Sequence, residues 1–508
     1  DGAHSFGERD AGNLLVEGDN LEALKALLPF YAGKVKCIYI DPPYNTGNEG
    51  WVYNDNVNSP EIRAWLGKVT GKEAEDLSRH DKWLCMMYPR LRILREFLAM
   101  DGSIFVSIDH NELSNLLCLM NEIFSGQNMV ATISWQKRYS RENRGDIGDA
   151  HEHIVIYSRH PERFRGSFNK VPLDAKSSTI YKNPNNDPKG RWRVIPMTAQ
   201  GFRPNQMYPI EAPSGRILRP PVGRCWSMIE PEFEKLKGIG RISFGKKGDS
   251  APGVLRYLSE VEGLVPWTWW PHDEVGHTDE AKKEIMAFGF SVNFETPKPV
   301  RLLTRIIQIA TSPGDLILDS FAGSGTTAVA VAREGQGRRF ILVEMDPAIS
   351  KSVTAARLRA TFQDANHPKE IDAVEIDRGG FRYCTLGKPL FDEWGAINVG
   401  VSFADLAAFA YFSDTGSPIP ACAADGDPLI GTFAGRAIYL LFSPDHAGVA
   451  SAPAGNVLTV ERLGALPLPA PGWTGPRTVY GEGCTVPAER LAAAGVTFKQ
   501  VPYQLAGA

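Results

Sequence analysis

Short runs of β-branched and aliphatic residues alternate with amphipathic segments over most of the first 363 residues, and this alternation limits the fold more than any other feature of the sequence. It is typical of a parallel sheet covered by helices. We therefore expect an α/β fold. The expected strands are residues 13–19, 35–41, 103–109, 153–158, 315–321 and 338–346, and the expected helices are residues 21–28, 83–100, 111–124, 298–310, 326–334 and 351–362.

The alternation fails for about a hundred residues after residue 159, where Pro, Gly, Trp and basic residues dominate. Residues 160–260 contain 18 Lys and Arg against 9 Asp and Glu, although the whole chain has a formal net charge of -4. An inserted domain that contacts nucleic acid would explain this excess, and a solvated surface loop is the alternative. From residue 364 the chain becomes rich in Ala, Gly and Pro. The expected division is an α/β domain in two parts (13–159 and 266–363), an inserted domain (160–265) and a C-terminal domain (364–508).

Composition narrows the class of protein. A chain of 508 residues with 43% hydrophobic and 22% charged residues is long enough for about two to four globular domains. No apolar run approaches the roughly 20 residues that a membrane-spanning helix needs, and the first residues show no signal-peptide pattern, so we expect a cytoplasmic protein. The seven cysteines are scattered without a C-x-x-C pair, which argues against a disulfide framework or a zinc cluster.

A glycine-containing turn stands between an expected strand and an expected helix, in the run Phe321-Ala322-Gly323-Ser324-Gly325-Thr326-Thr327. Glycines at such a place let a ligand approach the backbone and the helix N-terminus. The run has neither the G-K-[ST] ending of a phosphate-binding loop nor the full G-x-G-x-x-G spacing of a dinucleotide site. It favours a nucleotide-like ligand at the carboxyl edge of the sheet, with an ordinary tight turn as the alternative.

The second motif, Asp41-Pro42-Pro43-Tyr44, also follows the end of an expected strand and therefore belongs to the same edge of the sheet. Two successive prolines fix φ and hold the backbone in one conformation. Alone, this motif indicates a rigid loop exit. Combined with a glycine turn in one α/β domain, it indicates a functional site.

These motifs resemble those of DNA amino-methyltransferases, specifically the permuted group in which D-P-P-Y precedes F-x-G-x-G. The resemblance extends through SIDHNE, HEHIVIYS, TPKPVRLL, FAGSGTT and FILVEMD and covers most of residues 13–363. The segments NPNNDPKGRWR, GRCWS and RYLSEV are similar to modification subunits of Type III restriction-modification systems. The resemblance implies a circularly permuted, Rossmann-like S-adenosylmethionine-dependent methyltransferase fold, with an inserted target-recognition domain and a C-terminal α+β domain.

The resemblance also implies roles for acids at successive strand ends. Glu344 would accept hydrogen bonds from the ribose hydroxyls of S-adenosylmethionine, and Asp19 would lie near its adenine amino group. Asp319 and Asp41 would face its methionine ammonium, and the glycine turn would hold its carboxylate end with Lys298 nearby. Taken singly, an aspartate at such a place is more often a helix N-cap. The complete set expected at the cofactor is Asp19, Asp41, Lys298, Asp319, Phe321, Ala322, Gly323, Ser324, Gly325, Thr326, Glu344 and Asp346.

Methyl transfer from a sulfonium to an exocyclic amine needs aligned reactants, and it needs neither a metal nor a covalent enzyme intermediate. We expect Asp41 and the Pro42 carbonyl to accept hydrogen bonds from the amine, and Tyr44 to stack on a base flipped out of the duplex. Pro43 completes this catalytic motif. No Pro-Cys pair occurs, which disfavours carbon methylation of cytosine. N6 of adenine is favoured, and the alternatives are N4 of cytosine, an RNA substrate, or a non-catalytic DNA-binding subunit.

Recognition of the target is expected in residues 160–265, because Arg reads guanine edges or clamps phosphates. The resemblance further implies double-stranded DNA as the substrate and a homodimer, and it permits a restriction subunit with helicase and nuclease activity as a partner. The candidates for DNA contact are Arg191, Arg193, Arg203, Arg216, Arg219, Arg224, Lys246 and Lys247.

Overall fold

The computed structural model of this chain describes residues 2–7, 12–46, 74–140, 147–173, 178–289, 296–363, 379–392, 395–420 and 427–501, with the backbone alone for 74–78. The chain divides into two compact units. One comprises Asp1–Asn169 with Trp267–Ala508, and the other is Lys170–Pro266. None of the helices in the described part of the chain is long and apolar enough to cross a membrane.

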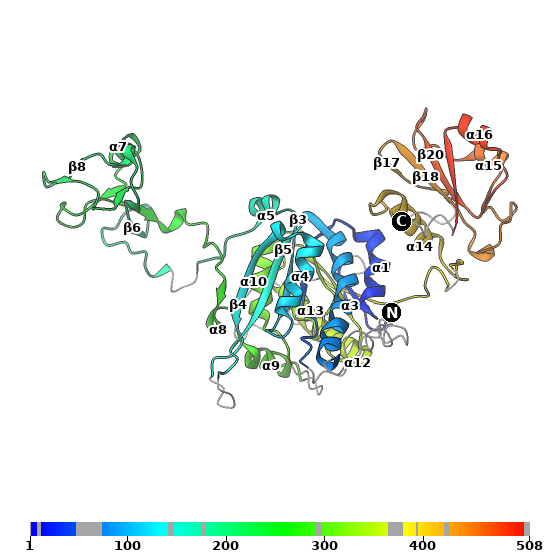
Figure 1. Cartoon of the computed structure of the whole chain (residues 1–508), viewed down its shortest axis with the longest axis horizontal. Helices are drawn as coiled ribbons and strands as arrows, with labels where there is room; N and C mark the ends of the chain where they lie inside the picture. Colours follow the sequence, from blue (N-terminus) through cyan, green and yellow to red (C-terminus); the bar gives the residue numbers. More distant parts are fainter. Residues whose placement is uncertain are drawn as a thin grey trace. The chain divides into compact units, whose positions relative to one another are not determined.

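Within the described residues, a nine-stranded sheet in the order β13-β4-β5-β3-β2-β14-β15-β1-β16 forms the centre of the first unit (Figure 1). β14 and β15, from the second half of the sequence, lie between β2 and β1 from its beginning. This arrangement confirms the permuted α/β fold that the sequence predicts. The strands are β1 (Leu14–Glu17), β2 (Val35–Ile40), β3 (Leu98–Ile108), β4 (Met129–Gln136), β5 (His151–Ser158), β13 (Trp269–Trp270), β14 (Leu316–Asp319), β15 (Arg339–Glu344) and β16 (Arg382–Thr385).

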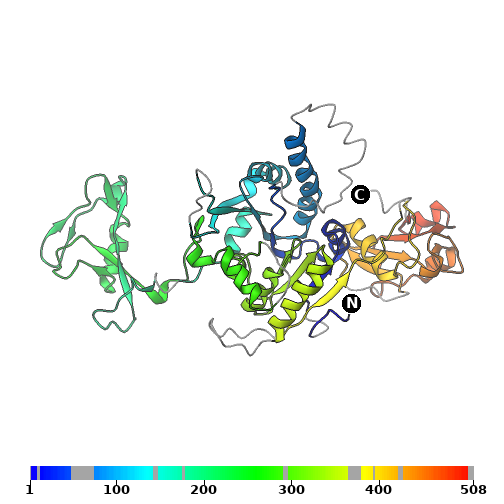
Figure 2. The same cartoon turned by 90° about the horizontal axis from the view of Figure 1, so that it is seen from below.

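Helices cover both faces of this sheet (Figures 1 and 2). On one face lie α1 (Asn20–Tyr31), α3 (Ala74–Phe97) and α4 (Leu113–Phe124). On the other lie α10 (Val300–Ala310), α11 (Thr326–Glu334) and α13 (Ala356–Gln363). Shorter helices of the same unit are η2 (Gly126–Asn128), α5 (Pro161–Ser167), α8 (His272–Val275), α9 (Thr278–Met286), α12 (Pro347–Ile349) and η5 (Ser350–Ala355).

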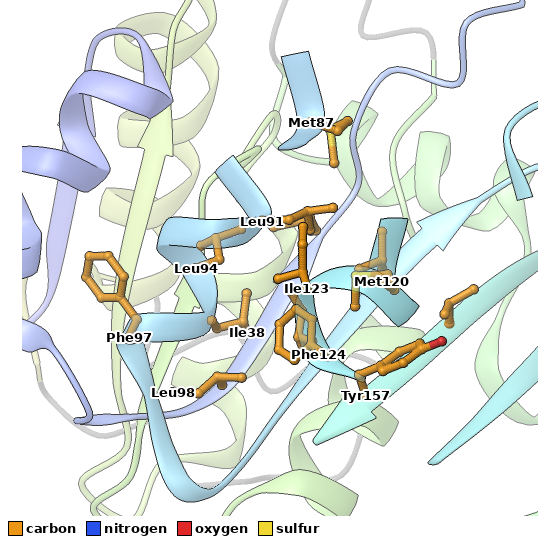
Figure 3. Close-up of a cluster of buried hydrophobic side chains, with 14 of the residues drawn as sticks. Ile38, Met87, Leu91, Leu94, Phe97, Leu98, Met120, Ile123, Phe124 and Tyr157 are labelled. Atoms are coloured by element: carbon orange, nitrogen blue, oxygen red, sulfur yellow. The ribbon is translucent and has the colours of Figure 1, made fainter. Parts of the chain in front are cut away.

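A hydrophobic cluster fills the space between the central strands and helices α3 and α4 (Figure 3). Met87, Leu91 and Leu94 of α3 are fully buried in it. Ile123 and Phe124 of α4 belong to the same cluster and are at most 5% exposed. Burial of such a side chain stabilises a fold by roughly 1.5–3 kcal/mol, so this cluster holds β2 and β3 firmly in place.

The strand directions bring the two sequence motifs to one edge. β2, β14, β15 and β1 pair in parallel, and so do β2 and β3, so the carboxyl ends of all five meet at the same edge. β5 runs antiparallel to β3, so the first residues of β5 reach this edge as well. β4 runs antiparallel to β5, so it ends there too.

The central sheet extends further along the sequence than expected. β16 pairs in parallel with β1 through Leu14 and Arg382, so residues assigned from sequence to a C-terminal domain complete the edge of this sheet. The following region has its own sheet, in the order β17-β18-β20-β22, with parallel pairing of β18, β20 and β22. Helices between these strands give it a more α/β character than the expected α+β domain. Its elements are α14 (Phe403–Thr415), β17 (Leu429–Phe433), β18 (Arg436–Leu441), η6 (Pro444–His446), β19 (Val457–Leu458), α15 (Val460–Ala465), β20 (Arg477–Gly481), β21 (Gly483–Cys484), α16 (Ala488–Ala493) and β22 (Val496–Gln500).

The second unit, Lys170–Pro266, consists of short strands around a small core. Met197, Trp226 and Phe233 are at most 1% exposed in this core. β11, β12 and β6 form one small sheet, and β10-β7 and β8-β9 are two-stranded pairs. Its elements are β6 (Trp192–Pro196), β7 (Thr198–Gln200), η3 (Pro204–Gln206), β8 (Ile210–Glu211), β9 (Ile217–Leu218), β10 (Arg224–Trp226), α7 (Glu230–Gly238), β11 (Ile242–Ser243), β12 (Gly253–Tyr257) and η4 (Leu258–Glu260).

Candidate functional site

Asp41 and Tyr44 take part in a largely buried hydrogen-bond network at the carboxyl end of β2. The Tyr44 hydroxyl lies 2.8 Å from Oδ1 of Asp41 and 3.0 Å from Oε2 of Glu152, the second residue of β5. Nζ of Lys298 lies 2.6 Å from Oδ2 of Asp41 and 2.9 Å from the Tyr44 hydroxyl. Because a phenol has one proton, Tyr44 donates to one carboxylate at a time. Each oxygen of Asp41 thus has one donor beside it, the Tyr44 hydroxyl at Oδ1 and the Lys298 ammonium at Oδ2.

The charges in this network are fixed by burial and by neighbours. Burial alone would lower the pKa of Lys298, but Asp41 and Glu152 outweigh it and raise that pKa above its usual value. Burial likewise favours a neutral Glu152, yet Lys298 and Lys137 lower its pKa, so it stays a carboxylate. Burial raises the pKa of Asp41, and Lys298 opposes the rise. Burial and then the charge of Asp41 raise the pKa of Tyr44, which stays a neutral phenol.

Neighbouring side chains hold the loop that carries this motif. Nε1 of Trp83 donates to the Pro43 carbonyl at 2.7 Å. Asn45 adopts a left-handed backbone with φ of 59°, and its Nδ2 donates to Oε1 of Glu112 at 2.5 Å. Glu112 is fully buried and is also contacted by Nδ1 of His80 at 2.6 Å. The loop is therefore pinned on both sides of Tyr44.

The glycine turn connects β14 to α11 in a conformation that requires glycine. Gly323 and Gly325 have φ of 49° and 75°, in the left-handed region that glycine adopts without strain. A Cβ on Gly325 would lie 2.9 Å from Cγ2 of Thr354. Within the described residues, the buried hydroxyl of the neighbouring Ser320 has no hydrogen-bond partner.

Acids at the ends of β14 and β15 brace this turn. Asp319 accepts the Phe321 N–H at 3.0 Å and the Thr327 hydroxyl at 2.5 Å. Burial raises the pKa of Asp319 to about 7 despite these hydrogen bonds. Glu344 accepts the N–H groups of Gly323 and Asp346 at 2.8 and 3.0 Å, and burial raises its pKa too.

The two aspartates that the sequence left open between capping and ligand binding both cap helices. Asp19 accepts the Leu21 N–H at 2.8 Å and is the N-cap of α1. Its other oxygen lies 3.2 Å from the fully buried Arg90. Asp346 is exposed and accepts the Ala348 N–H at 2.7 Å as the N-cap of α12.

Glu152 and Arg357 belong to the site although no sequence motif predicts them. Arg357 is 1% exposed, and its guanidinium donates to the Ser324 carbonyl and the Thr326 hydroxyl from behind the turn. Burial lowers its pKa to about 10. Glu152 stands out in the sequence as the acid in the strand HEHIVIYS, whereas Arg357 has no comparable signal. The structure also places Lys298 against Asp41 and Tyr44, while the resemblance placed it beside the carboxylate end of the ligand.

The eight basic residues predicted to contact DNA fall into two groups by exposure, with Arg193 and Arg224 partly buried. Arg193 stacks over the Tyr181 ring at 5.2 Å, and Arg224 donates through Nε to the Thr198 hydroxyl at 3.1 Å. Their guanidinium groups are thus partly engaged within the unit. The exposed members of the predicted set are Arg191, Arg203, Arg216, Arg219, Lys246 and Lys247.

Comparison with known proteins gives a consistent set of similarities. A family described as DNA methylase matches residues 35–355. The Mod subunit of the Type III restriction-modification enzyme StyLTI from Salmonella typhimurium is 36% identical over 372 residues, or 69% of this chain and 55% of that protein. The EcoP15I Mod subunit from Escherichia coli is 30% identical over 432 residues, or 74% of this chain and 66% of that protein.

Among solved structures, the cytosine-N4-specific PvuII DNA methyltransferase aligns with a TM-score of 0.36 and 14% identity, covering 73% of this chain and 93% of that one. This chain spans 55% and 66% of the length of the two Mod subunits.

Proposed function

This chain belongs to the DNA methylase family, and from that premise we propose that it transfers a methyl group from S-adenosylmethionine to N6 of an adenine flipped out of duplex DNA. One observation carries the proposal. The D-P-P-Y motif and the glycine turn, 280 residues apart in sequence, lie at the ends of the neighbouring strands β2 and β14. A cofactor at the turn and a base at Asp41 would therefore be adjacent.

The glycine turn fits the proposed cofactor. Its left-handed glycines keep the backbone bare, and the buried Ser320 hydroxyl is a polar group that still lacks a partner among the described residues. We propose that the backbone of residues 321–325 binds the amino-acid end of S-adenosylmethionine and that Glu344 binds its ribose hydroxyls. Asp19 would bind its adenine amino group, and Asp346 would lie near the cofactor. When bound, S-adenosylmethionine supplies an electrophilic methyl group. Asp319, whose oxygens brace the turn, lies near the proposed position of the ammonium, whose positive charge would favour the ionised form of this carboxyl.

Asp41 is the proposed hydrogen-bond acceptor for the target amine, together with the Pro42 carbonyl. Its side chain is 22% exposed, whereas that of Lys298 is 8% exposed, so the Asp41 carboxylate is the more accessible partner of this ion pair. Accepting both amino hydrogens localises the nitrogen lone pair for attack. Tyr44, on the same rigid loop, is the proposed stacking partner of the base, and stacking on an aromatic ring recovers part of the cost of flipping.

We propose that residues 160–265, which overlap the second compact unit, recognise the target sequence through their exposed basic side chains. Phosphate contacts would position the duplex, and one or more Arg side chains would read base edges. The similarity to Mod subunits supports a role as the modification subunit of a Type III restriction-modification system. We propose that the protein acts as a homodimer and associates with a restriction subunit.

Transfer of labelled methyl groups tests this function directly. The purified protein is incubated with S-adenosylmethionine carrying a tritiated methyl group and with duplex DNA, single-stranded DNA or RNA. We expect label in duplex DNA, recovered as N6-methyladenine after hydrolysis to nucleosides. Label recovered as N4-methylcytosine would assign the other amine, and label in RNA alone would assign an RNA substrate. Absence of label in all three nucleic acids would leave a binding subunit as the remaining alternative.

A further inference from the structure

We infer that Glu152 is a positioning residue that accepts the hydrogen bonds of Tyr44 and Lys298 when the target amine binds to Asp41. The inference rests on the methyl transfer proposed above. It concerns a residue to which the two sequence motifs assign no role, because Glu152 comes from the antiparallel strand β5.

Both oxygens of Asp41 already lie beside hydrogen-bond donors. Its Oδ1 lies 2.8 Å from the Tyr44 hydroxyl, and its Oδ2 lies 2.6 Å from Nζ of Lys298. The target amine also has to donate to Asp41. A carboxylate has about four lone-pair sites, so the amine could share Asp41 with both donors, but release of Tyr44 or Lys298 leaves the amine an oxygen of its own and strengthens that hydrogen bond.

Glu152 is the acceptor to which both donors can turn. Its Oε2 lies 3.0 Å from the Tyr44 hydroxyl and 3.6 Å from Nζ of Lys298. Rotation of the phenolic O–H redirects the Tyr44 proton from Asp41 to Glu152. Lys298 needs to move by about 1 Å to reach normal hydrogen-bond distance. Exchange of partners therefore requires no movement of the backbone.

Glu152 is held ready for this exchange. It is 9% exposed, and register with Trp135 on β4 fixes its place in the sheet. Nζ of Lys137 lies 3.3 Å from its Oε1, which keeps that oxygen occupied and leaves Oε2 facing Tyr44 and Lys298. Without the charge of Glu152, Asp41 would be the only carboxylate among the described residues in contact with Lys298, and the amine would compete with a buried ammonium for it.

The charge of Glu152 also acts on Asp41 directly. Asp41 faces Lys298, Tyr44 and Glu152, with Asp319 on the neighbouring strand. Burial raises the pKa of Asp41, Lys298 lowers it, and the negative charge of Glu152 raises it. Neutralising Glu152 therefore lowers the pKa of Asp41. If ionised Asp41 is required, the acid limb of the pH profile moves to lower pH.

The test compares Glu152→Gln with a matched control, Asp149→Asn. Asp149 lies 3.0 Å from Nζ of Lys137, so the control also removes one carboxylate from Lys137, but away from Tyr44. For Glu152→Gln we expect kcat to fall at least tenfold, KM for DNA and cofactor to stay within about twofold, and the acid limb of kcat/KM to move to lower pH. The control keeps the wild-type kcat and acid limb. Equilibrium DNA affinity, measured by fluorescence anisotropy without cofactor, stays normal in both variants.

A second variant covers the case in which the glutamine variant does not fold. Glu152→Asp keeps the negative charge, but its side chain is one methylene shorter, so the carboxylate lies farther from Tyr44 and Lys298. We therefore expect kcat to fall while the acid limb of the pH profile stays near its wild-type position. Wild-type kcat and an unmoved acid limb in Glu152→Gln would overturn the inference. A parallel loss of DNA affinity and thermal stability would overturn it too, because it would indicate a structural role. A wild-type protein that transfers no methyl group contradicts the proposed function itself, and this result is distinct from both.

Discussion

Replacing Asp41 with Asn should abolish methyl transfer while leaving DNA binding intact. The substitution keeps the size of the side chain but turns one acceptor oxygen into an NH₂ donor, which then faces either the Tyr44 hydroxyl at 2.8 Å or the Lys298 ammonium at 2.6 Å. Loss of a contact made to the reacting group lowers turnover by about a hundredfold or more, or about 2.7 kcal/mol of transition-state free energy.

The same substitution should also cost some stability. Removing one partner of a buried ion pair costs about 3–5 kcal/mol, because the remaining charge is left unpaired. Lys298 still has Glu152 at 3.6 Å, so we expect the lower end of that range, about 3 kcal/mol. The variant should therefore fold and remain testable at moderate temperature.

The assay is single-turnover transfer of a tritiated methyl group, with DNA affinity measured in parallel by fluorescence anisotropy. Asp101→Asn is the control, because Asp101 pairs with Lys36 at 2.5 Å and lies before the central part of β3, away from the carboxyl edge. The control should match the wild type in rate. Turnover within a few fold of wild type in the folded Asp41→Asn variant would refute the assignment of the reacting amine to Asp41.

Three further predictions concern the cofactor, the pH response and the DNA. Gly323→Val should abolish S-adenosylmethionine binding in calorimetry, because φ of 49° strains a branched residue at the turn. The control Gly33→Val, at a position with φ of 68° and open space around it, should bind the cofactor normally. Unchanged affinity in Gly323→Val would place the cofactor elsewhere. Burial raises the pKa of Asp319 to about 7. The free energy of unfolding of the wild type, relative to that of Asp319→Asn, should therefore fall as pH rises from about 4 to about 7 and stay constant above about pH 7. Chemical denaturation measures this difference, and a difference that does not change with pH would argue against the raised pKa. In an alanine scan of the exposed members of the predicted set, loss of a phosphate contact should reduce the salt slope of DNA binding by about one unit, whereas loss of a base-reading Arg should cost roughly 1–3 kcal/mol at one position of the site. Wild-type behaviour across the predicted set would place recognition outside residues 160–265.

The sequence predicts the parts of this site that depend on single strands and turns. D-P-P-Y and the glycine turn each follow a strand whose direction is set by the parallel α/β pattern, so their meeting at one edge follows from the fold class. Helix capping is likewise a local feature. From the sequence, Asp19 and Asp346 could each be a helix N-cap or a cofactor ligand, and in the structure they cap α1 and α12.

The contacts that sequence reasoning missed depend on strand direction and on long-range pairing. A period-2 pattern does not give the direction of a strand, so it could not reveal that β5 runs antiparallel and brings Glu152 to Tyr44. Nor could it predict that Lys298, which precedes α10, reaches Asp41 across 257 positions. β16 is only four residues long and is defined by its pairing with β1. No local sequence pattern predicts this pairing.

Adenine methylation by this chain is tested most directly by expressing it in bacterial cells that lack DNA methylation and mapping modified bases across the genome by long-read sequencing. Because the proposed site presents Asp41 and Tyr44 to an adenine amine, we expect N6-methyladenine at one recognition sequence, and none in cells that express Asp41→Asn. Absence of N6-methyladenine in the wild type, or N4-methylcytosine in its place, would contradict this expectation.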